Sequence, residues 1–366
     1  MSTLFSEINI NNLRIKNRIV MPPMVTFIYA KEDGTVTDAH VKHYEERAKG
    51  GVGLIITEAT SCVKGNDVIL RLWSDKYIEG FRRISDICHK HGAKVLVQLA
   101  HAGLKAARNS PKDDIVSSSD YYEVSKVDNS VISARGLTVY EIHSLQQAFI
   151  DTAARAKKAG YDGIELHGAH GYLINQFLSP AINKRTDLYG GSVPNRTRFV
   201  TEIIRGIKKT LGNDFIISCR IGCNDPDLQT SIKTAKELEK AGVDLLHISS
   251  GMFLPPEIDS SELPQVPDNF SYNWIVYSGT EIRKNVNIPV IVVNNIKTPE
   301  QASFLIENDL ADFVAIGKNL LVDAEWVNKA KQNNDISLCL NCKVCAWFNS
   351  EKSCPGKSFT RKFNKK

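Results

Sequence analysis

Eight short runs of β-branched and other apolar residues recur along the chain, and nearly every run is followed by an amphipathic stretch and a glycine. This alternation is typical of a chain that repeats strand, helix, strand. The runs are almost continuously apolar, as expected for strands of a parallel sheet that is covered on both faces. They cover residues 19–24, 53–59, 94–100, 163–167, 215–221, 244–249, 289–293 and 313–317.

Eight such strands predict an α/β protein, a (β/α)8 TIM barrel built as one domain over residues 1–330. A doubly wound sheet is the rival, but no G-x-G-x-x-G motif follows the first strand and opens a helix. Helices are predicted over 144–159, 195–211 and 230–241, each with a capping residue before it and a glycine after it. Trp326 is expected to begin or cap a last helix.

Two segments fall outside the strand and helix alternation. Residues 105–138 are rich in Ser and Asp and poor in apolar residues, which indicates a long excursion over the barrel mouth after the third strand. Residues 331–366 form a C-terminal extension that contains four cysteines and a basic tail. We do not interpret this extension as a second domain.

Charge and hydropathy exclude two classes of partner. The net charge of +5 is carried by the last ten residues, so the body of the protein is neutral and has no basic face for nucleic acid. No run of about 18 apolar residues is present, which argues against a membrane span. The sequence predicts a soluble, cytoplasmic protein, either a monomer or a homo-oligomer, that acts on a small molecule.

The carboxyl ends of barrel strands form the active site in this fold class, so position selects candidate residues. This filter selects Pro23, Met24, Val25, Glu58, Ala59, Gln98, His101, His167, His170, Tyr172, Arg220, residues 249–251, Asn294, Asn295, Gly317 and Lys318.

The filter also suggests chemistry at two of these positions. Gly317 and Lys318 follow the eighth strand, where barrels often bind phosphate against backbone N–H groups. Arg220 lies in an otherwise apolar strand, where a permanent charge is costly unless it meets an anion. That anion is either a structural ion-pair partner or a cofactor that becomes negative on reduction.

Two imidazoles and a phenol follow the fourth strand in the run His167-Gly-Ala-His170-Gly-Tyr172. A metal site is disfavoured, because the one carboxylate nearby in sequence, Glu165, is expected to point to the other face of the strand. Two neutral imidazoles that donate to one substrate oxygen fit better, with Tyr172 as a proton donor.

Four segments resemble the Old Yellow Enzyme family of NADH:flavin oxidoreductases, over roughly residues 1–330. They are KNRIVMPPM at 16–24, QLAH at 98–101, HGAHGYLINQFLSP at 167–180 and RTDLYGGSVPNR at 185–196. The resemblance implies a barrel that binds FMN noncovalently and an ene-reductase that uses NADH or NADPH to reduce the activated C=C bond of α,β-unsaturated carbonyl compounds.

The resemblance also implies roles for the residues at matching positions. Pro23 and Met24 would pack near the flavin, Ala59 and Gln98 would contact its pyrimidine edge, and Arg220 would face its N1. Asn294, Asn295, Gly317 and Lys318 would hold the phosphate. His167 and His170 would bind the substrate carbonyl, and Tyr172 would donate the proton.

Some residues depart from the family pattern. Val25 stands where many relatives have Thr or Cys near the flavin O4, Asn294 and Asn295 stand where two glycines are common, and Lys318 replaces Arg. Because the valine side chain cannot donate a hydrogen bond, the redox potential of the flavin should differ from that in these relatives. The replacements at Asn294, Asn295 and Lys318 should make the contacts to the phosphate looser.

The cysteines at 339, 342, 345 and 354 have the spacing C-x2-C-x2-C-x8-C. This looks like a shortened version of the segment that binds a [4Fe–4S] cluster in the dienoyl-CoA reductase branch of the family. A cluster, a zinc ion at Cys339, Cys342, Cys345 and Cys354, or no metal all stay open at this point. Two alternatives to an ene-reductase follow: an iron–sulfur enoyl or dienoyl reductase fed by a partner, and a flavin- or metal-binding interaction protein without turnover.

Overall fold

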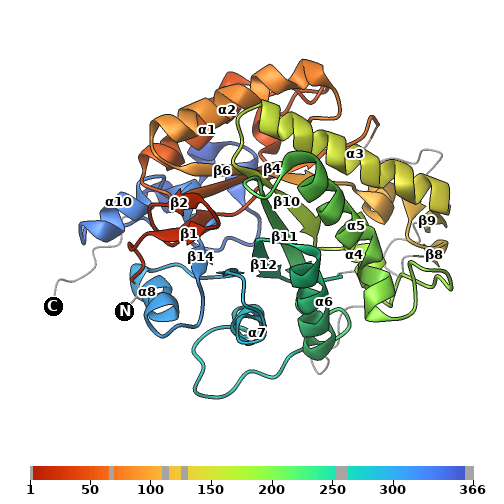
Figure 1. Cartoon of the computed structure of the whole chain (residues 1–366). Coiled ribbons are helices and arrows are strands. Elements are labelled where there is room, and N and C mark those ends of the chain that lie inside the picture. The colour runs from red at the N-terminus through yellow and green to blue at the C-terminus, as the bar shows by residue number, and fades with distance from the viewer. Residues whose placement is uncertain (1–2, 66–69, 109–114, 125–130, 253–262, 359–366) are drawn as a thin grey trace.

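Eight parallel strands close into a barrel in the computed structural model, which describes residues 3–65, 70–108, 115–124, 131–252 and 263–358. The hydrogen-bonded order is β3, β14, β13, β12, β11, β10, β6, β4, and pairing of β3 with β4 closes the ring (Figure 1). The strands are β3 (Ile19–Met21), β4 (Leu54–Ser61), β6 (Lys94–Ala100), β10 (Gly163–Gly168), β11 (Ile216–Gly222), β12 (Leu245–Ser249), β13 (Val290–Val293) and β14 (Phe313–Ala315). The predicted TIM barrel is therefore confirmed, and each strand overlaps its predicted run, although β4, β10 and β11 extend one or two residues beyond theirs.

Helices surround the barrel because their apolar faces pack on the outward side chains of the strands (Figure 1). In chain order they are α1 (Asp38–Lys49), α2 (Ile78–Lys90), α3 (Val139–Lys158), α4 (Leu173–Leu178), α5 (Val193–Leu211), α6 (Leu228–Ala241), α7 (Trp274–Arg283), α8 (Pro299–Glu307), α9 (Lys318–Val322) and α10 (Trp326–Lys331). No helix within the described ranges has the length and apolarity needed to cross a membrane.

Helix α3 begins five residues before the predicted start at Ser144. Thr138 caps it, since its side chain accepts from the backbone N–H of Glu141 while the Glu141 side chain accepts from the backbone N–H of Thr138. This reciprocal pair satisfies two backbone donors at the first turn. The predicted end at residue 159 differs by one residue, because the helix ends at Lys158 and Ala159 caps it just before Gly160, whose φ is +83°.

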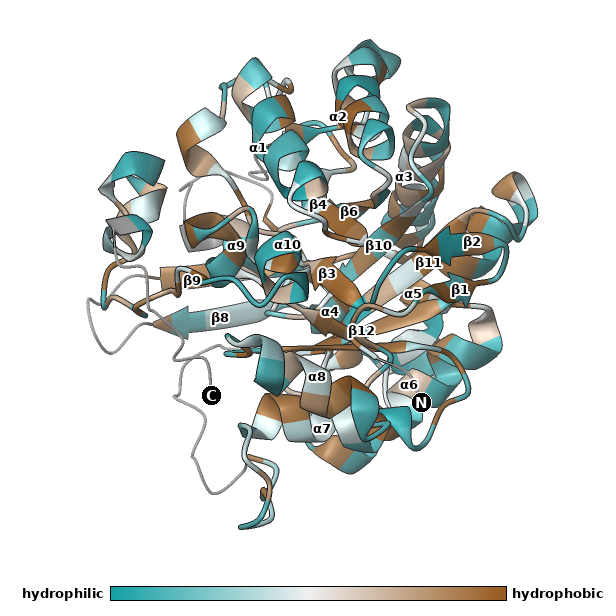
Figure 2. Ribbon diagram, turned by 90° about the vertical axis from the view of Figure 1, so that its left-hand side faces the viewer, coloured by the Kyte–Doolittle hydropathy of each residue, from teal (hydrophilic) through white to brown (hydrophobic). Residues whose placement is uncertain are grey.

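The two ends of the barrel carry different additions. Strands β1 (Ile8–Ile10) and β2 (Leu13–Ile15) form a hairpin at one end, while β8 (Tyr121–Val124) and β9 (Val131–Gly136) lie at the other (Figure 2). With the short strand β7 (Val116–Ser117), β8 and β9 make a three-stranded sheet within the predicted excursion. Ile132 of this sheet packs on Met252 beyond β12, so the excursion does lie at the mouth.

Candidate active site

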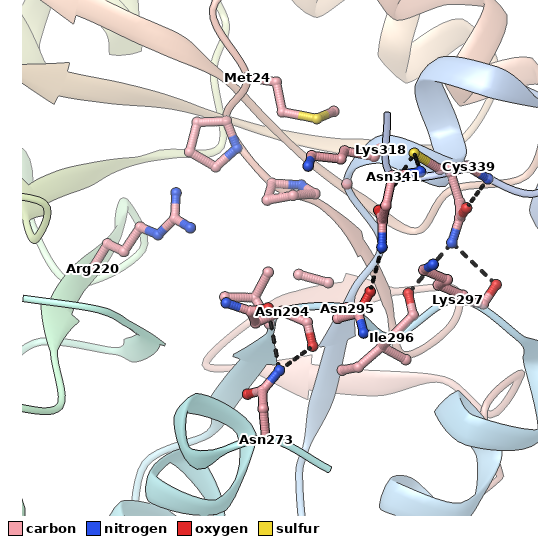
Figure 3. A pocket seen from close by; sticks show the side chains of 16 residues that line it. Met24, Arg220, Asn273, Asn294, Asn295, Ile296, Lys297, Lys318, Cys339 and Asn341 are labelled. Atoms are coloured by element: carbon pink, nitrogen blue, oxygen red, sulfur yellow. Dashed lines mark hydrogen bonds between the residues drawn. The ribbon is translucent and has the colours of Figure 1, made fainter. Parts of the chain in front are cut away.

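A pocket of about 530 Å³ opens at the carboxyl ends of β13 and β14 (Figure 3). Seven of the predicted cofactor residues line it, namely Pro23, Met24, Arg220, Asn294, Asn295, Gly317 and Lys318. Sequence reasoning missed the other polar residues of the wall, which are Asn273, Lys297, Asn319 and Asn341, with Cys339 beside them. Among the described residues, the wall holds three cationic side chains and five amides but no carboxylate, so it suits an anionic ligand.

Arg220 forms the inner end of this pocket. Its side chain is buried, and within the described chain its hydrogen-bond partner is Ser249, whose Oγ lies 3.2 Å from Nη2. Its Nε is buried and has no hydrogen-bond partner among the residues that the structure describes. Burial lowers the pKa of Arg220 to about 10, against the opposing effect of Glu165, so the guanidinium stays charged at neutral pH. A buried cation with an unused donor fits an anionic cofactor edge better than a structural ion pair.

Three further predicted residues lie beside this pocket. Val25 packs on Ala59 and Ala100 in a small apolar cluster next to the mouth. Gln98 lies deeper, where its Nε2 donates to Oε1 of Glu165 at 2.8 Å. The structure therefore fixes the orientation of the Gln98 amide through a carboxylate that we did not expect there.

Our prediction for Glu165 was wrong. Its Oε2 accepts from Ser218 Oγ at 3.2 Å and lies 2.9 Å from Nδ1 of His247, which places Glu165 inside the barrel. Residues two apart on a strand share a face, so Glu165 and His167 point to the same side. The carboxylate lies one layer below the imidazole, where it holds Gln98 and His247 in place.

His167, His170 and Tyr172 come together as predicted. The His167 ring centroid lies 5.2 Å from that of His170 and 4.4 Å from that of Tyr172. Burial, assisted by the charge of Arg220, lowers the pKa of both histidines well below its ordinary value, so both rings are neutral. Burial also raises the pKa of Tyr172, which keeps its phenol protonated.

Ser249 links Arg220 to His170. Its hydroxyl accepts from Nη2 of Arg220 at 3.2 Å and lies 2.7 Å from Nε2 of His170. Because a hydroxyl both donates and accepts, this contact suits either tautomer of the neutral His170 ring. On His167, Nδ1 is buried without a partner in the described residues. The sequence selected Ser249 only by its place after the sixth strand.

Lys105 adds a second cation beside these rings. Its Nζ lies 5.0 Å from the centroid of the Tyr172 ring, and its charge contributes to lowering the pKa of His167 and His170. His101 lies nearby in sequence at the end of β6, but its Nδ1 accepts from the backbone N–H of Gly103 at 3.1 Å. This hydrogen bond from Gly103 to His101 holds the start of the loop after β6.

Glu58 anchors the loop that carries Pro23, Met24 and Val25. The pairing of β4 with β6 shifts register between Thr57 and Thr60, and Glu58 lies within this irregularity. Its carboxylate accepts from the backbone N–H of Thr26 at 3.0 Å and from the Thr26 hydroxyl at 2.5 Å. Burial raises the pKa of Glu58 to about 7, although Thr26 and Tyr44 donate hydrogen bonds that oppose the shift.

This raised pKa predicts a pH-dependent stability. The folded protein holds the proton more tightly than the unfolded chain, whose Glu58 has the ordinary value of 4.5, so stability is lost as the pH rises through 7. We expect the unfolding free energy of the wild type, relative to that of Glu58→Gln, to be about 3 kcal/mol lower at pH 8 than at pH 4.5. Urea unfolding at both pH values measures it.

The exposed Glu300→Gln variant is the control and should track the wild type at both pH values. If the unfolding free energies of the wild type and of Glu58→Gln differed by the same amount at pH 4.5 and at pH 8, Glu58 would not change its protonation in this range.

The four tail cysteines do not form a metal site in this structure. No three His, Cys, Asp or Glu side chains in the described ranges are close enough together to hold a metal ion. The Cys342 side chain is exposed, while Cys339, Cys345 and Cys354 are half-buried. Metal at this segment stays a prediction.

The comparisons with known proteins agree with this site. Residues 3–336 match the model of the NADH:flavin oxidoreductase / NADH oxidase family. The chain is 44% identical to an NADH oxidase of Thermoanaerobacter brockii over 93% of its own length and 53% of that protein, so it spans about half of this relative. It is 38% identical to an NADPH dehydrogenase of Halalkalibacterium halodurans over 89% of the chain and 93% of that protein.

A solved structure shows the same likeness. The Old Yellow Enzyme homologue of Zymomonas mobilis superposes with a TM-score of 0.76 at 25% identity, over 93% of this chain and 95% of that one. The fold, the pocket and these matches agree, and the chain belongs to the NADH:flavin oxidoreductase / NADH oxidase family, of the Old Yellow Enzyme type.

Proposed function

We propose that this protein is an FMN-dependent ene-reductase that takes electrons from NADH or NADPH and reduces the C=C bond of α,β-unsaturated carbonyl compounds. The observation that carries the proposal is Arg220, a buried guanidinium at the inner end of a pocket whose outer end carries Lys297 and Lys318. The lining residues that the structure describes include no carboxylate. Together these charges suit a ligand that is anionic at both ends.

The residues of the pocket fit FMN. Lys318 and the Asn294–Asn295 turn would hold its phosphate, and Arg220 would neutralise its ring edge at N1. The apolar cluster of Val25, Ala59 and Ala100 offers no hydrogen bond beside the ring. When bound, FMN supplies hydride chemistry, which no amino-acid side chain can perform.

The neighbouring rings fit an unsaturated carbonyl substrate. His167 and His170 would each donate, from the ring nitrogen that carries its proton, to the carbonyl oxygen of the substrate. These donors stabilise the negative charge that develops on that oxygen during the reaction. Tyr172 would donate its proton to the α-carbon. Neutral imidazoles suit this role, because they bind a neutral carbonyl without a change of protonation.

Anaerobic purification followed by flavin, iron and turnover assays tests the proposal. We expect a yellow protein with about one FMN per chain that oxidises NADH or NADPH faster when cyclohexenone is added. A colourless protein that does not take up FMN would refute the proposal. FMN binding without turnover would instead support an interaction protein, and about four iron atoms per chain would support the iron–sulfur reductase.

A further inference from the structure

We propose that Asn341, in the segment beyond the barrel, binds the phosphate of the cofactor and holds the Asn294–Asn295 turn in place. The inference rests on the proposed function, because it concerns how FMN is held. Asn341 lines the same pocket as Lys318 although the two residues are 23 positions apart along the chain. Figure 3 shows its side chain directed at Asn295, with Lys318 on the same side of the pocket.

The segment that carries Asn341 is fixed to the barrel rather than loosely apposed. Ile336 and Leu338 are buried in the hydrophobic core. The backbone N–H of Ser337 donates to Asp323 Oδ2 at 3.0 Å, and that of Cys339 donates to Asn319 Oδ1 at 2.7 Å. Since Asn319 itself lines the pocket, this second bond ties the segment directly to the pocket wall.

The turn after β13 needs support from other elements. Asn294 has a φ of +114°, which is unfavourable for residues other than glycine, and Asn295 has a φ of +54°, in the left-handed region that Asn enters more readily than most residues. Asn273 donates from Nδ2 to Oδ1 of Asn294 at 3.2 Å, and Asn341 donates from Nδ2 to Oδ1 of Asn295 at 3.2 Å. Each residue of the turn is thus held by one amide from a different part of the chain.

The remaining hydrogen-bonding capacity of Asn341 points to an anion. Its Oδ1 lies 3.7 Å from the thiol of Cys339, and one Nδ2 hydrogen is used by Asn295. The amide has a second Nδ2 hydrogen, which can donate to a ligand. With Lys297 and Lys318 on the same wall, the ligand that fits this donor is a phosphate group.

Comparing FMN with riboflavin tests the inference, because the two differ only in the phosphate. We expect Asn341→Ala to raise the dissociation constant of FMN about tenfold, or about 1.4 kcal/mol, in the full chain stripped of flavin. The dissociation constant of riboflavin should change less than about twofold. Asn341→Asp should weaken FMN further and leave riboflavin unaffected, because its carboxylate would repel the phosphate. Quenching of flavin fluorescence measures both constants.

The exposed Asn349 of the same segment provides a matched control, since Asn349→Ala removes an amide that does not line the pocket. FMN binding unchanged in both Asn341 variants would overturn the inference while leaving the proposed function intact. Equal weakening of FMN and riboflavin would also overturn it, because Asn341 would then only maintain the shape of the pocket. Failure of the wild type to bind either flavin would instead refute the proposed function.

Discussion

Replacing Tyr172 by Phe should slow reduction of an enone by about 100-fold or more, while oxidation of NADH or NADPH by the enzyme proceeds at the normal rate. The substitution removes the phenolic proton but keeps the ring that lies 4.4 Å from His167. General acid catalysis typically contributes 100-fold to 10,000-fold to a rate. Stopped-flow measurement of the two halves of the catalytic cycle, each followed separately, tests this expectation.

The control for this substitution is Tyr140→Phe, because the Tyr140 side chain is 80% exposed on helix α3. It should leave both halves of the cycle unchanged. If Tyr172→Phe slowed both halves equally, Tyr172 would be a residue of the pocket wall rather than the proton donor.

Replacing Arg220 by Met should weaken FMN binding by about tenfold to 100-fold, as expected for the loss of hydrogen bonds to a charged group. It should also lower the midpoint potential by about 30 to 60 mV, since the guanidinium favours the more negative, reduced cofactor. Titration of the flavin-free protein with FMN and an anaerobic redox titration provide the two measurements.

Stability distinguishes a functional Arg220 from a structural one. Burying a guanidinium without an ion pair is costly, so Arg220→Met should leave the unfolding free energy of the flavin-free protein unchanged or higher. Arg220→Lys keeps the positive charge, so it should lower the midpoint potential less than Arg220→Met does. A destabilised flavin-free protein with an unchanged midpoint potential would mean that the charge serves the fold and not the cofactor.

Much of the fold could be predicted from the sequence, because the strand and helix pattern is local. Each of the eight apolar runs became a barrel strand, and the glycines after α3, α5 and α6 marked the helix ends. The prediction that began this helix at Ser144 was five residues late, because the Thr138 and Glu141 pair begins the helix at Val139.

The candidate site was predictable where position along a strand decides which end of the barrel a residue reaches. This rule brought Arg220, Lys318, His167 and Tyr172 to the mouth. It did not predict Glu165, because our reading of strand alternation was mistaken, nor the contact of Asn341 with Asn295, because no periodicity relates the two.

The sequence by itself determined the strand count, the approximate strand positions and the residue types gathered at the barrel mouth, since periodicity and motif spacing are properties of neighbouring residues. Only the tertiary structure decided that Ser249 joins Arg220 to His170 and that Asn341 reaches the pocket wall. Those contacts link residues 29, 79 and 46 positions apart. They exist because closing the barrel and packing Ile336 and Leu338 into the core bring these distant segments together, which no local pattern specifies.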